Sequence, residues 1–288
     1  MELNKIQNWT TSIGKGDSNS FSFKELWRYR DLLFLFVRRD FVKEFKQTIL
    51  GPLWFIIQPI FQTIILIFVF GKVGGLGPNG IPQITFYLAG TIVWNLFADC
   101  LLKTSEVFRA NAGIFTKVYF PRLIMPLSTV FTSYLKVLVQ LGILLAVYAY
   151  EFIFIGGFEP NFTIVLFPLY LIIASFLGLG MGLIISAMTT KYWDLRFLVQ
   201  FSIQLLMFLS AVITPYYVLA EKGGWMQKLI MLNPISSLIE AFRHAFLGNA
   251  GGWFHWQSLL YTVVTTIVVL ALGIVIFRRV ERNFVDTL

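Results

Sequence analysis

Polar and aromatic side chains recur at helical spacing inside two long apolar segments of this chain. On a helix, residues four apart share a face. Amides in hydrocarbon are costly unless they meet water or each other, so these two faces should look inward. They offer neutral hydrogen bonds and aromatic surface rather than an acid, a base or a nucleophile. The residues are Trp54, Gln58 and Gln62 in one segment and Gln200, Gln204 and Phe208 in the other.

Residues that could support catalysis are dispersed. A single cysteine, Cys100, excludes an internal disulfide, and two histidines, His244 and His255, do not form a metal-ligand cluster in the sequence. Asp99, Glu151 and Glu159 also lie on different segments, which disfavours a membrane-embedded glycan- or lipid-modifying enzyme. The chain contains no G-x-x-x-x-G-K-[ST] loop, so we expect it not to bind ATP itself.

The composition is that of a polytopic membrane protein. Of 288 residues, 57% are hydrophobic and 13% are charged, and a soluble domain could not bury so much apolar surface. The net charge of +8 could indicate nucleic acid as a partner of a soluble protein, but here the placement of the charges matters more. The first long apolar run begins only near residue 50, so we expect no cleavable signal peptide.

The pattern predicts an all-α fold with six transmembrane helices, since each apolar run approaches the roughly 20 residues that a bilayer core requires. Gly178, Gly180 and Gly182 predict close helix packing in the fourth. Residues 50–277 form the predicted six-span region and 278–288 a polar tail. The predicted spans are residues 50–70, 84–102, 123–150, 162–190, 197–213 and 259–277.

The amino-terminal part divides in two. Residues 1–22 are polar, and we expect them to be loosely ordered. In residues 23–46, apolar side chains recur at intervals of three, four and seven with arginine and lysine between them. This pattern predicts a helix on an anionic membrane surface, the alternative being a helix packed on the same protein.

Two polar connections and two short apolar pieces stand out between the spans. Residues 109–122 contain a short amphipathic stretch broken by Pro121, which suggests either a docking helix for a soluble partner or an ordinary positive loop. Residues 191–196 form a compact charged turn. Residues 225–232 and 234–247 are too short to span, so they predict two re-entrant half-helices between the fifth and sixth spans.

The second half-helix has clear boundary signals. Asn233 suits the N-cap, Pro234 suits the first helical position and Gly248 suits the end. Glu240 can pair with Arg243 or with His244 along the same helix.

Positive charge assigns the two sides of the membrane. Of 23 lysines and arginines, 18 lie in residues 1–49, 103–122 and 191–196 and in the carboxyl-terminal tail. By the positive-inside rule, these segments and both termini are cytoplasmic, and the half-helices face outward.

Several short motifs, in their order and spacing, resemble the membrane subunit of ABC exporters that move polysaccharides, the O-antigen and teichoic-acid type. The resemblance covers residues 23–288. The motifs are Trp27-Arg-Tyr-Arg-Asp-Leu, Arg38-Arg39-Asp40, Leu50-Gly-Pro-Leu-Trp54, Asn111-Ala-Gly-Ile114, Tyr119-Phe-Pro-Arg122, Asp194-Leu-Arg196, Leu232-Asn-Pro-Ile235 and Glu281-Arg-Asn-Phe284.

The resemblance implies that two copies form a channel with two ATP-binding cassette subunits, which carry ATP and Mg²⁺ while this chain binds no cofactor. It implies a bacterial inner membrane, contact with membrane lipids, and a polysaccharide carried on a polyprenyl diphosphate lipid. Residues 109–122 would be the coupling helix, residues 191–196 a second contact, and the half-helices the outer gate. The implied coupling residues are Asn111, Ile114, Tyr119, Phe120, Pro121, Arg122, Asp194 and Arg196, and the implied gate residues are Asn233, Pro234, Glu240 and Arg243.

The first and fifth spans would line the path, which agrees with their side chains. Sugar rings present apolar faces and hydroxyl edges, so aromatic rings and neutral amides suit a glycan. The alternative role for these side chains is to hold helices together. Two further transporter classes are an ABC efflux permease for a small amphiphile, and a secondary transporter, which would usually carry more intramembrane carboxylates than Asp99 alone.

Overall fold

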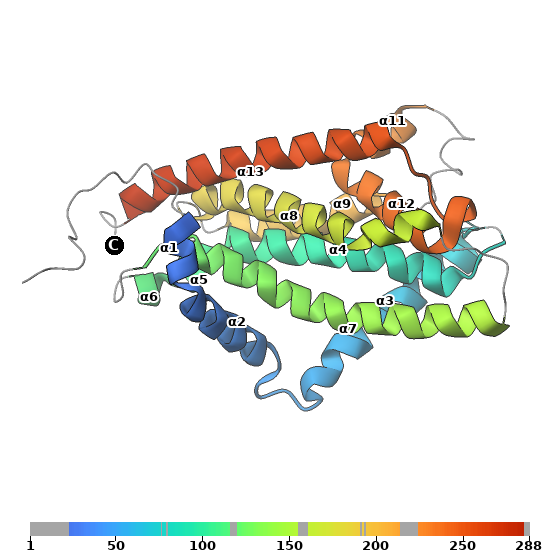
Figure 1. Ribbon diagram of the computed structural model, residues 1–288, viewed down its shortest axis with the longest axis horizontal. Helices are drawn as coiled ribbons and strands as arrows, with labels where there is room; N and C mark the ends of the chain where they lie inside the picture. Colours follow the sequence, from blue (N-terminus) through green and yellow to red (C-terminus); the bar gives the residue numbers. More distant parts are fainter. Residues whose placement is uncertain are drawn as a thin grey trace, which may run out of the picture.

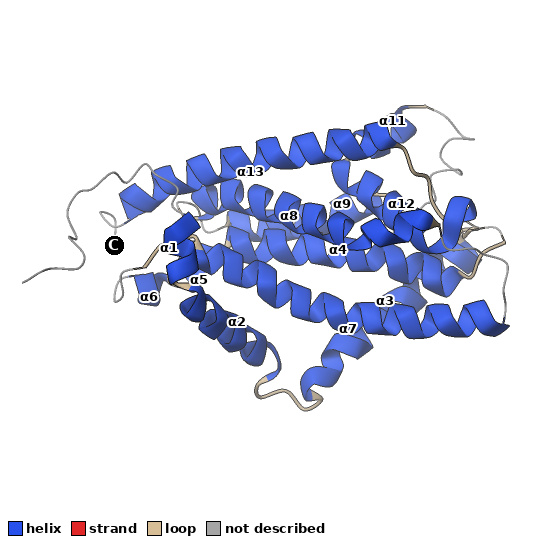
Figure 2. Cartoon of the chain, in the orientation of Figure 1, coloured by secondary structure: helices blue, strands red, loops and turns tan. Residues whose placement is uncertain are grey.

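The computed structural model describes residues 23–75, 77–78, 80–115, 120–154, 161–190, 192, 194–213 and 224–284. The expectation of loose order in residues 1–22 falls outside this part of the chain, as does the placement of Tyr119. Figure 2 shows helices and no strand among the described residues. The prediction of an all-helical fold is therefore confirmed for them.

Long helices lie side by side along the length of the molecule, with shorter ones at their ends (Figure 1). In chain order the elements are α1 (Phe23–Arg28), α2 (Arg30–Phe45), η1 (Gly51–Leu53), α3 (Trp54–Leu66), the π-helix η2 (Ile67–Val73), α4 (Gln83–Ser105), α5 (Val107–Ala110), α6 (Ala112–Phe115), α7 (Ile124–Phe154), η3 (Phe162–Leu166), α8 (Phe167–Thr189), α9 (Leu195–Phe208), α11 (Trp225–Leu232), α12 (Pro234–Leu247), η4 (Gly248–Ala250) and α13 (Trp256–Phe284).

Five helical stretches of the described chain are long and apolar enough to cross a membrane. They are Gly51–Val73, Gln83–Ser105, Ile124–Phe154, Phe162–Thr189 and Trp256–Val280, and they coincide with five of the six predicted spans. The protein is therefore a polytopic membrane protein.

The remaining predicted span, residues 197–213, differs from the expectation. Its helix α9 has 14 residues and ends at Phe208, and residues 209–213 form turns. At 1.5 Å per residue, a helix of this length covers about 21 Å, less than the roughly 30 Å of a hydrocarbon core. The helix of the last predicted span is longer than expected, because α13 continues through the expected tail residues Arg278 and Arg279 to Phe284.

Helix α4 forms the centre of the bundle. In its apolar 18-residue window 83% of the residues are buried, compared with 17–44% in the other four candidate spans. Helices α3, α7, α8 and α12 all pack against it. The more exposed helices α3, α7 and α13 present apolar side chains outward, as expected for surfaces in contact with lipid or with another chain.

The glycines of α8 allow its close packing, as predicted. A Cβ atom at Gly178 would lie 2.5 Å from the carbonyl oxygen of Phe97 in α4. A Cβ atom at Gly180, on the other side of α8, would lie 2.8 Å from the backbone nitrogen of Leu270 in α13. The glycines therefore let α8 approach both neighbours at backbone distance.

Helices α1 and α2 are separated by a break at Tyr29, and α2 packs on the protein itself. The side chain of Phe36 is buried, whereas Phe34 and Leu35 beside it are exposed. One face of α2 therefore contacts the bundle, as in the alternative given by the sequence, and its exposed apolar side chains leave surface available for a membrane.

Candidate functional site

The connection at residues 107–122 lies with α1 at one end of the bundle, and α11 and α12 lie at the opposite end (Figure 1). In its described part it comprises two single-turn helices, α5 and α6. Its residues 116–119 fall outside the described residues. We call residues 107–122 the basic connection.

The basic connection is attached to α2. The Oδ1 atom of Asn111 accepts a hydrogen bond of 3.0 Å from Arg39, while its Nδ2 atom donates to the carbonyl oxygen of Val107. The ring of Phe120 is buried, with its centroid 5.6 Å from that of Phe36 and 5.8 Å from that of Phe115. Phe120 therefore fixes the connection against α2 and does not form part of its outer surface.

The other coupling candidates lie around this buried ring. The guanidinium carbon of Arg122 lies 5.6 Å from the centroid of Phe115, and Pro121 precedes the first turn of α7. Ile114 is half-buried against the hydrophobic core. All three residues are partly buried.

The turn at residues 191–196 is joined to the same end of the bundle. The Nε atom of Arg196 lies 2.7 Å from the carboxylate of Glu106, between α4 and α5. The hydroxyl of Thr189 donates to the carbonyl oxygen of Ser105. Asp194 is exposed, and its carbonyl oxygen accepts from the amide of Phe197. The structure thus joins the turn at residues 191–196 to the residue that directly precedes the basic connection.

The amide and aromatic faces of α3 and α9 remain largely open. Gln62 is partly buried and accepts a 3.2 Å hydrogen bond from Asn95 of α4, so its amide bridges two helices. Trp54 and Gln58 are exposed on α3, and Gln200, Gln204 and Phe208 are exposed on α9. The two segments approach at one end, where the ring centroids of Phe70 and Phe208 lie 6.3 Å apart.

Four charged residues form a cluster between α2, α4 and α7. The ammonium of Lys136 lies 2.9 Å from the carboxylate of Asp99 and 2.7 Å from that of Glu44. Lys103 pairs with Glu44 and lies 3.7 Å from Asp99. Two carboxylates and two ammonium groups neutralise each other, which accounts for charges in otherwise apolar helices. The sequence alone did not identify Glu44 as a partner of these residues.

At the opposite end, Arg243 holds α12 against the bundle. Its side chain is fully buried and donates to the carbonyl oxygens of Phe86, Ala211 and Val212. It also lies 3.3 Å from Glu240, as one of the two predicted pairings requires. Burial lowers the pKa of Arg243 to about 10, which leaves it positively charged at neutral pH.

The boundaries of α12 are those that its sequence predicts. The side chain of Asn233 accepts a hydrogen bond from the amide of Ile235, Pro234 occupies the first helical position, and Gly248 follows the last residue with a φ of 68°. Only glycine adopts that backbone conformation readily. Asn233 also contacts the carbonyl oxygen of Leu209, which ties the half-helices to the end of α9.

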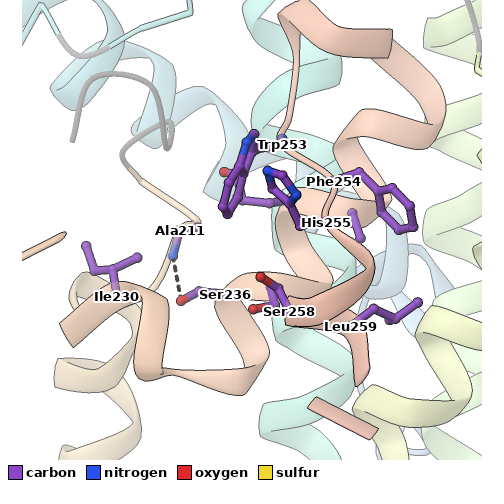
Figure 3. Close-up of a pocket in the computed structure, with 11 residues that line it drawn as sticks. Ala211, Ile230, Ser236, Trp253, Phe254, His255, Ser258 and Leu259 are labelled. Carbon is purple, nitrogen blue, oxygen red and sulfur yellow. Dashed lines mark hydrogen bonds between the residues drawn. The ribbon is translucent and has the colours of Figure 1, made fainter. Parts of the chain in front are cut away.

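A small pocket lies beside these half-helices. The rings of Trp253 and His255 point toward each other at its rim, with centroids 3.9 Å apart, and Phe254 points away (Figure 3). Ser236 accepts a hydrogen bond from the amide of Ala211 on the other side of the pocket. The pocket therefore separates the turns after α9 from the segment that leads into α13.

The residues that could support catalysis are separated and are bound by their own neighbours. Glu151 accepts from Thr85, and the two ring nitrogens of His244 contact Thr163 and Asn249. Among the described residues, no group of three or more potential metal ligands comes together. Glu159 lies outside them.

Comparison with known proteins agrees with this architecture. The ABC-2 type transporter family matches residues 31–247, three-quarters of the chain. The chain belongs to this family. It is the membrane permease subunit of a transporter, a transport component without a catalytic domain.

Among its relatives within this ABC-2 family, an O-antigen export system permease protein RfbA of Klebsiella pneumoniae is 28% identical over 90% of this chain and 95% of its own length. A protein of the same name from Myxococcus xanthus is 24% identical, over 92% of this chain and 98% of its own. The polysialic acid transport protein KpsM of Escherichia coli is 25% identical, over 85% of this chain and 91% of its own. The resemblance to ABC polysaccharide exporters is thereby confirmed as a distant homology.

Proposed function

We propose that this permease subunit forms the channel of an ATP-driven exporter that moves a lipid-linked, O-antigen-like polysaccharide outward. The observation that carries the proposal is the similarity to proteins named for O-antigen export and polysialic acid transport, which extends over nearly the full length of each. A small-amphiphile permease would share the family but not this set of relatives.

Energy enters through the basic connection and the turn at residues 191–196. Two ATP-binding cassette subunits, with their ATP and Mg²⁺, bind this end of the bundle, and this chain binds neither. The contact between Arg196 and Glu106 supports the proposal, because a force applied to either segment is shared by both. The bond from Arg39 to Asn111 extends this connection to α2.

The path forms between two copies of the chain and uses the open faces of α3 and α9. These faces carry exposed indole, phenyl and amide groups, which suit the apolar faces and hydroxyl edges of sugars. In this arrangement α9 and the turns after it form the sixth crossing. A short helix continued by turns is tolerated where it is covered by protein or lines a cavity.

The half-helices α11 and α12 form the outer gate of this path. Asn233 caps α12 and Pro234 begins it, while Arg243, paired with Glu240, fixes it to α4 and to residues 211–212. The gate position of α12 thus depends on the same turns that end the α9 segment.

The subunit resides in a bacterial inner membrane with both termini in the cytoplasm. This orientation places the basic connection, residues 191–196 and the basic helix α2 beside the anionic inner leaflet. Single cysteines in residues 109–122 and in residues 248–255 should react with an impermeant thiol reagent from opposite sides of the membrane. Reaction of the basic connection from outside intact cells would reject this orientation.

Deletion of the gene in its host tests the transport function. We expect finished, lipid-linked polymer to accumulate inside the cell and to disappear from the surface, and a plasmid copy should restore export. The sugar composition of the accumulated polymer would then identify the substrate. Normal surface polymer in the deletion strain, with defective efflux of a small amphiphile, would replace the proposal with the other permease class.

A further inference from the structure

A cleft of about 350 Å³ opens between α2, α3, α4 and α7. Helices α2 and α3 diverge from the loop that joins them, and both reach α7 (Figure 1). The walls combine aromatic rings, amides and the charged cluster described above. The lining residues are Glu44, Trp54, Phe55, Gln58, Pro59, Asn95, Asp99, Lys136 and Gln140.

The charges in the cleft are balanced when Lys103, which pairs with Glu44, is counted together with the lining residues. Lys136 is paired with both Asp99 and Glu44, and its ammonium also lies 6.0 Å from the centroid of Phe55. An anionic ligand would meet two carboxylates, and a cationic ligand would have to displace an existing partner. The balance therefore favours an uncharged ligand.

The amide oxygen of Gln140 is unsatisfied at the wall of this cleft. The residue is 8% exposed, and among the described residues its Oε1 atom has no hydrogen-bond partner. A buried acceptor without a donor costs free energy, so such a group in a native protein calls for a partner that arrives from elsewhere. The partner must carry an N–H or O–H group.

The aromatic wall of the cleft adds a second requirement for the ligand, a flat apolar face. Trp54 is 46% exposed and lines the same cleft, with the amide of Gln58 one helical turn further along α3. An indole face binds flat apolar surface, and an amide binds hydroxyl groups as donor and acceptor. One neutral ring that has an apolar face and a hydroxyl edge satisfies Trp54, Gln58 and Gln140 together.

We propose that this cleft is a binding site for one neutral sugar unit, in which a sugar hydroxyl donates to Oε1 of Gln140 and the ring lies against Trp54. This inference rests on the proposed function and names a site within it for the exported glycan. Its position between α2, α3 and α7 places the sugar beside the charged cluster, so binding would be sensitive to movements of α2.

Thiol labelling of the full transporter with its ATPase partner in lipid nanodiscs can test the site. The one native cysteine, Cys100, is completely buried, so an Asn95→Cys variant, at a partly buried lining residue that none of the proposed sugar contacts uses, should provide the reactive thiol. The probes are dodecyl maltoside, dodecyl glucoside and dodecyl galactoside below their micellar concentrations. Dodecylphosphocholine, which has the same chain and no sugar, is the control for a lipid or alkyl site.

We expect at least one sugar probe to slow the labelling of Asn95→Cys about fivefold or more, and dodecylphosphocholine to have no such effect. Adding Gln140→Leu should raise the probe concentration needed for half-maximal protection about three- to tenfold, as the loss of one neutral hydrogen bond requires. The same change at the exposed Gln257 should leave it intact. Labelling without probe and thermal stability should not fall with Gln140→Leu, because a buried unpaired amide contributes no stabilising bond.

Two outcomes would overturn the site. Equal protection by dodecylphosphocholine would assign the cleft to alkyl chains or lipid, and no protection by any sugar probe would reject sugar binding altogether. Protection that survives Gln140→Leu would remove that residue from the site, and loss of stability in this variant would assign its amide a structural role. These readouts do not depend on export, so they can fail while the deletion experiment succeeds, and the reverse.

Discussion

The guanidinium of Arg196 lies 2.7 Å from the carboxylate of Glu106, across 90 residues of sequence. Arg196 lies in the first turn of α9, whose exposed face is proposed to line the path, and Glu106 lies between α4 and α5, directly before the basic connection. The central helix and a path-lining helix are therefore joined where an ATPase would bind.

Reversal of either charge should reduce export more than it reduces stability. The two side chains are 46% and 31% exposed, and exposed pairs contribute only about 0–1 kcal/mol. We expect Arg196→Glu or Glu106→Arg to lower export while the protein stays folded. The double exchange should restore part of it, which assays of surface polymer and ATPase co-purification would measure. Full export in both single variants would show that the pair has no part in coupling.

Removal of Arg243 should destabilise the outer end of the bundle. Arg243→Met leaves Glu240 without its cationic partner, and breaking a buried pair costs roughly 3–5 kcal/mol. Arg243→Lys should also be destabilising, because one ammonium cannot reproduce the fork that reaches Phe86 and Val212. Thermal unfolding of the purified subunit would measure the loss. Arg30→Met is the control, since its contact with Asp31 is exposed, and an equal effect there would contradict the assignment.

The glycines of α8 should tolerate no side chain. Gly180→Ala would place a Cβ atom 2.8 Å from the backbone of Leu270, so we expect a loss of roughly 1–3 kcal/mol from overpacking. Gly142→Ala in α7 is a matched control, because nothing lies within 4 Å of its added Cβ atom. It should be neutral or stabilising by up to about 1 kcal/mol. Equal thermal stability of the two variants would argue against backbone contact between α8 and α13.

The charged cluster should show strong coupling between its members. Lys136→Met leaves Asp99 and Glu44 with less compensation and should be destabilising, with reduced yield of folded protein. Adding Asp99→Asn should recover part of the loss, because it removes one uncompensated carboxylate. A double-mutant cycle by thermal unfolding should give an interaction free energy of about 0.5–3 kcal/mol. Additive effects would mean that the pair makes no contact.

The sequence predicts most of the fold through local signals. The length of each apolar run identifies five spans, and Asn233, Pro234 and Gly248 mark the boundaries of α12. Glycines in α8 predict its close contacts. Each of these depends on residues that are neighbours in the chain, so a single sequence is sufficient to read them.

What the sequence does not predict depends on contacts between distant residues. Glu44 and Lys136 belong to α2 and α7, and nothing in either segment indicates the other. Arg243 binds backbone carbonyl oxygens, which every residue possesses, so its partners leave no mark in the composition. The sequence places Phe120 among the implied coupling residues, but α2 packs against the basic connection and buries its ring.

The contact between Gly180 and Gly273 has a mechanical consequence. A Cβ atom at Gly273 would lie 2.6 Å from the carbonyl oxygen of Gly180, so α8 and α13 have no room to slide or roll against one another. Because α4 is held to α8 in the same way, the three helices α4, α8 and α13 form one rigid unit. Any widening of the proposed channel must then come from the lightly packed α3 and α9, which would move as outer segments relative to this rigid unit.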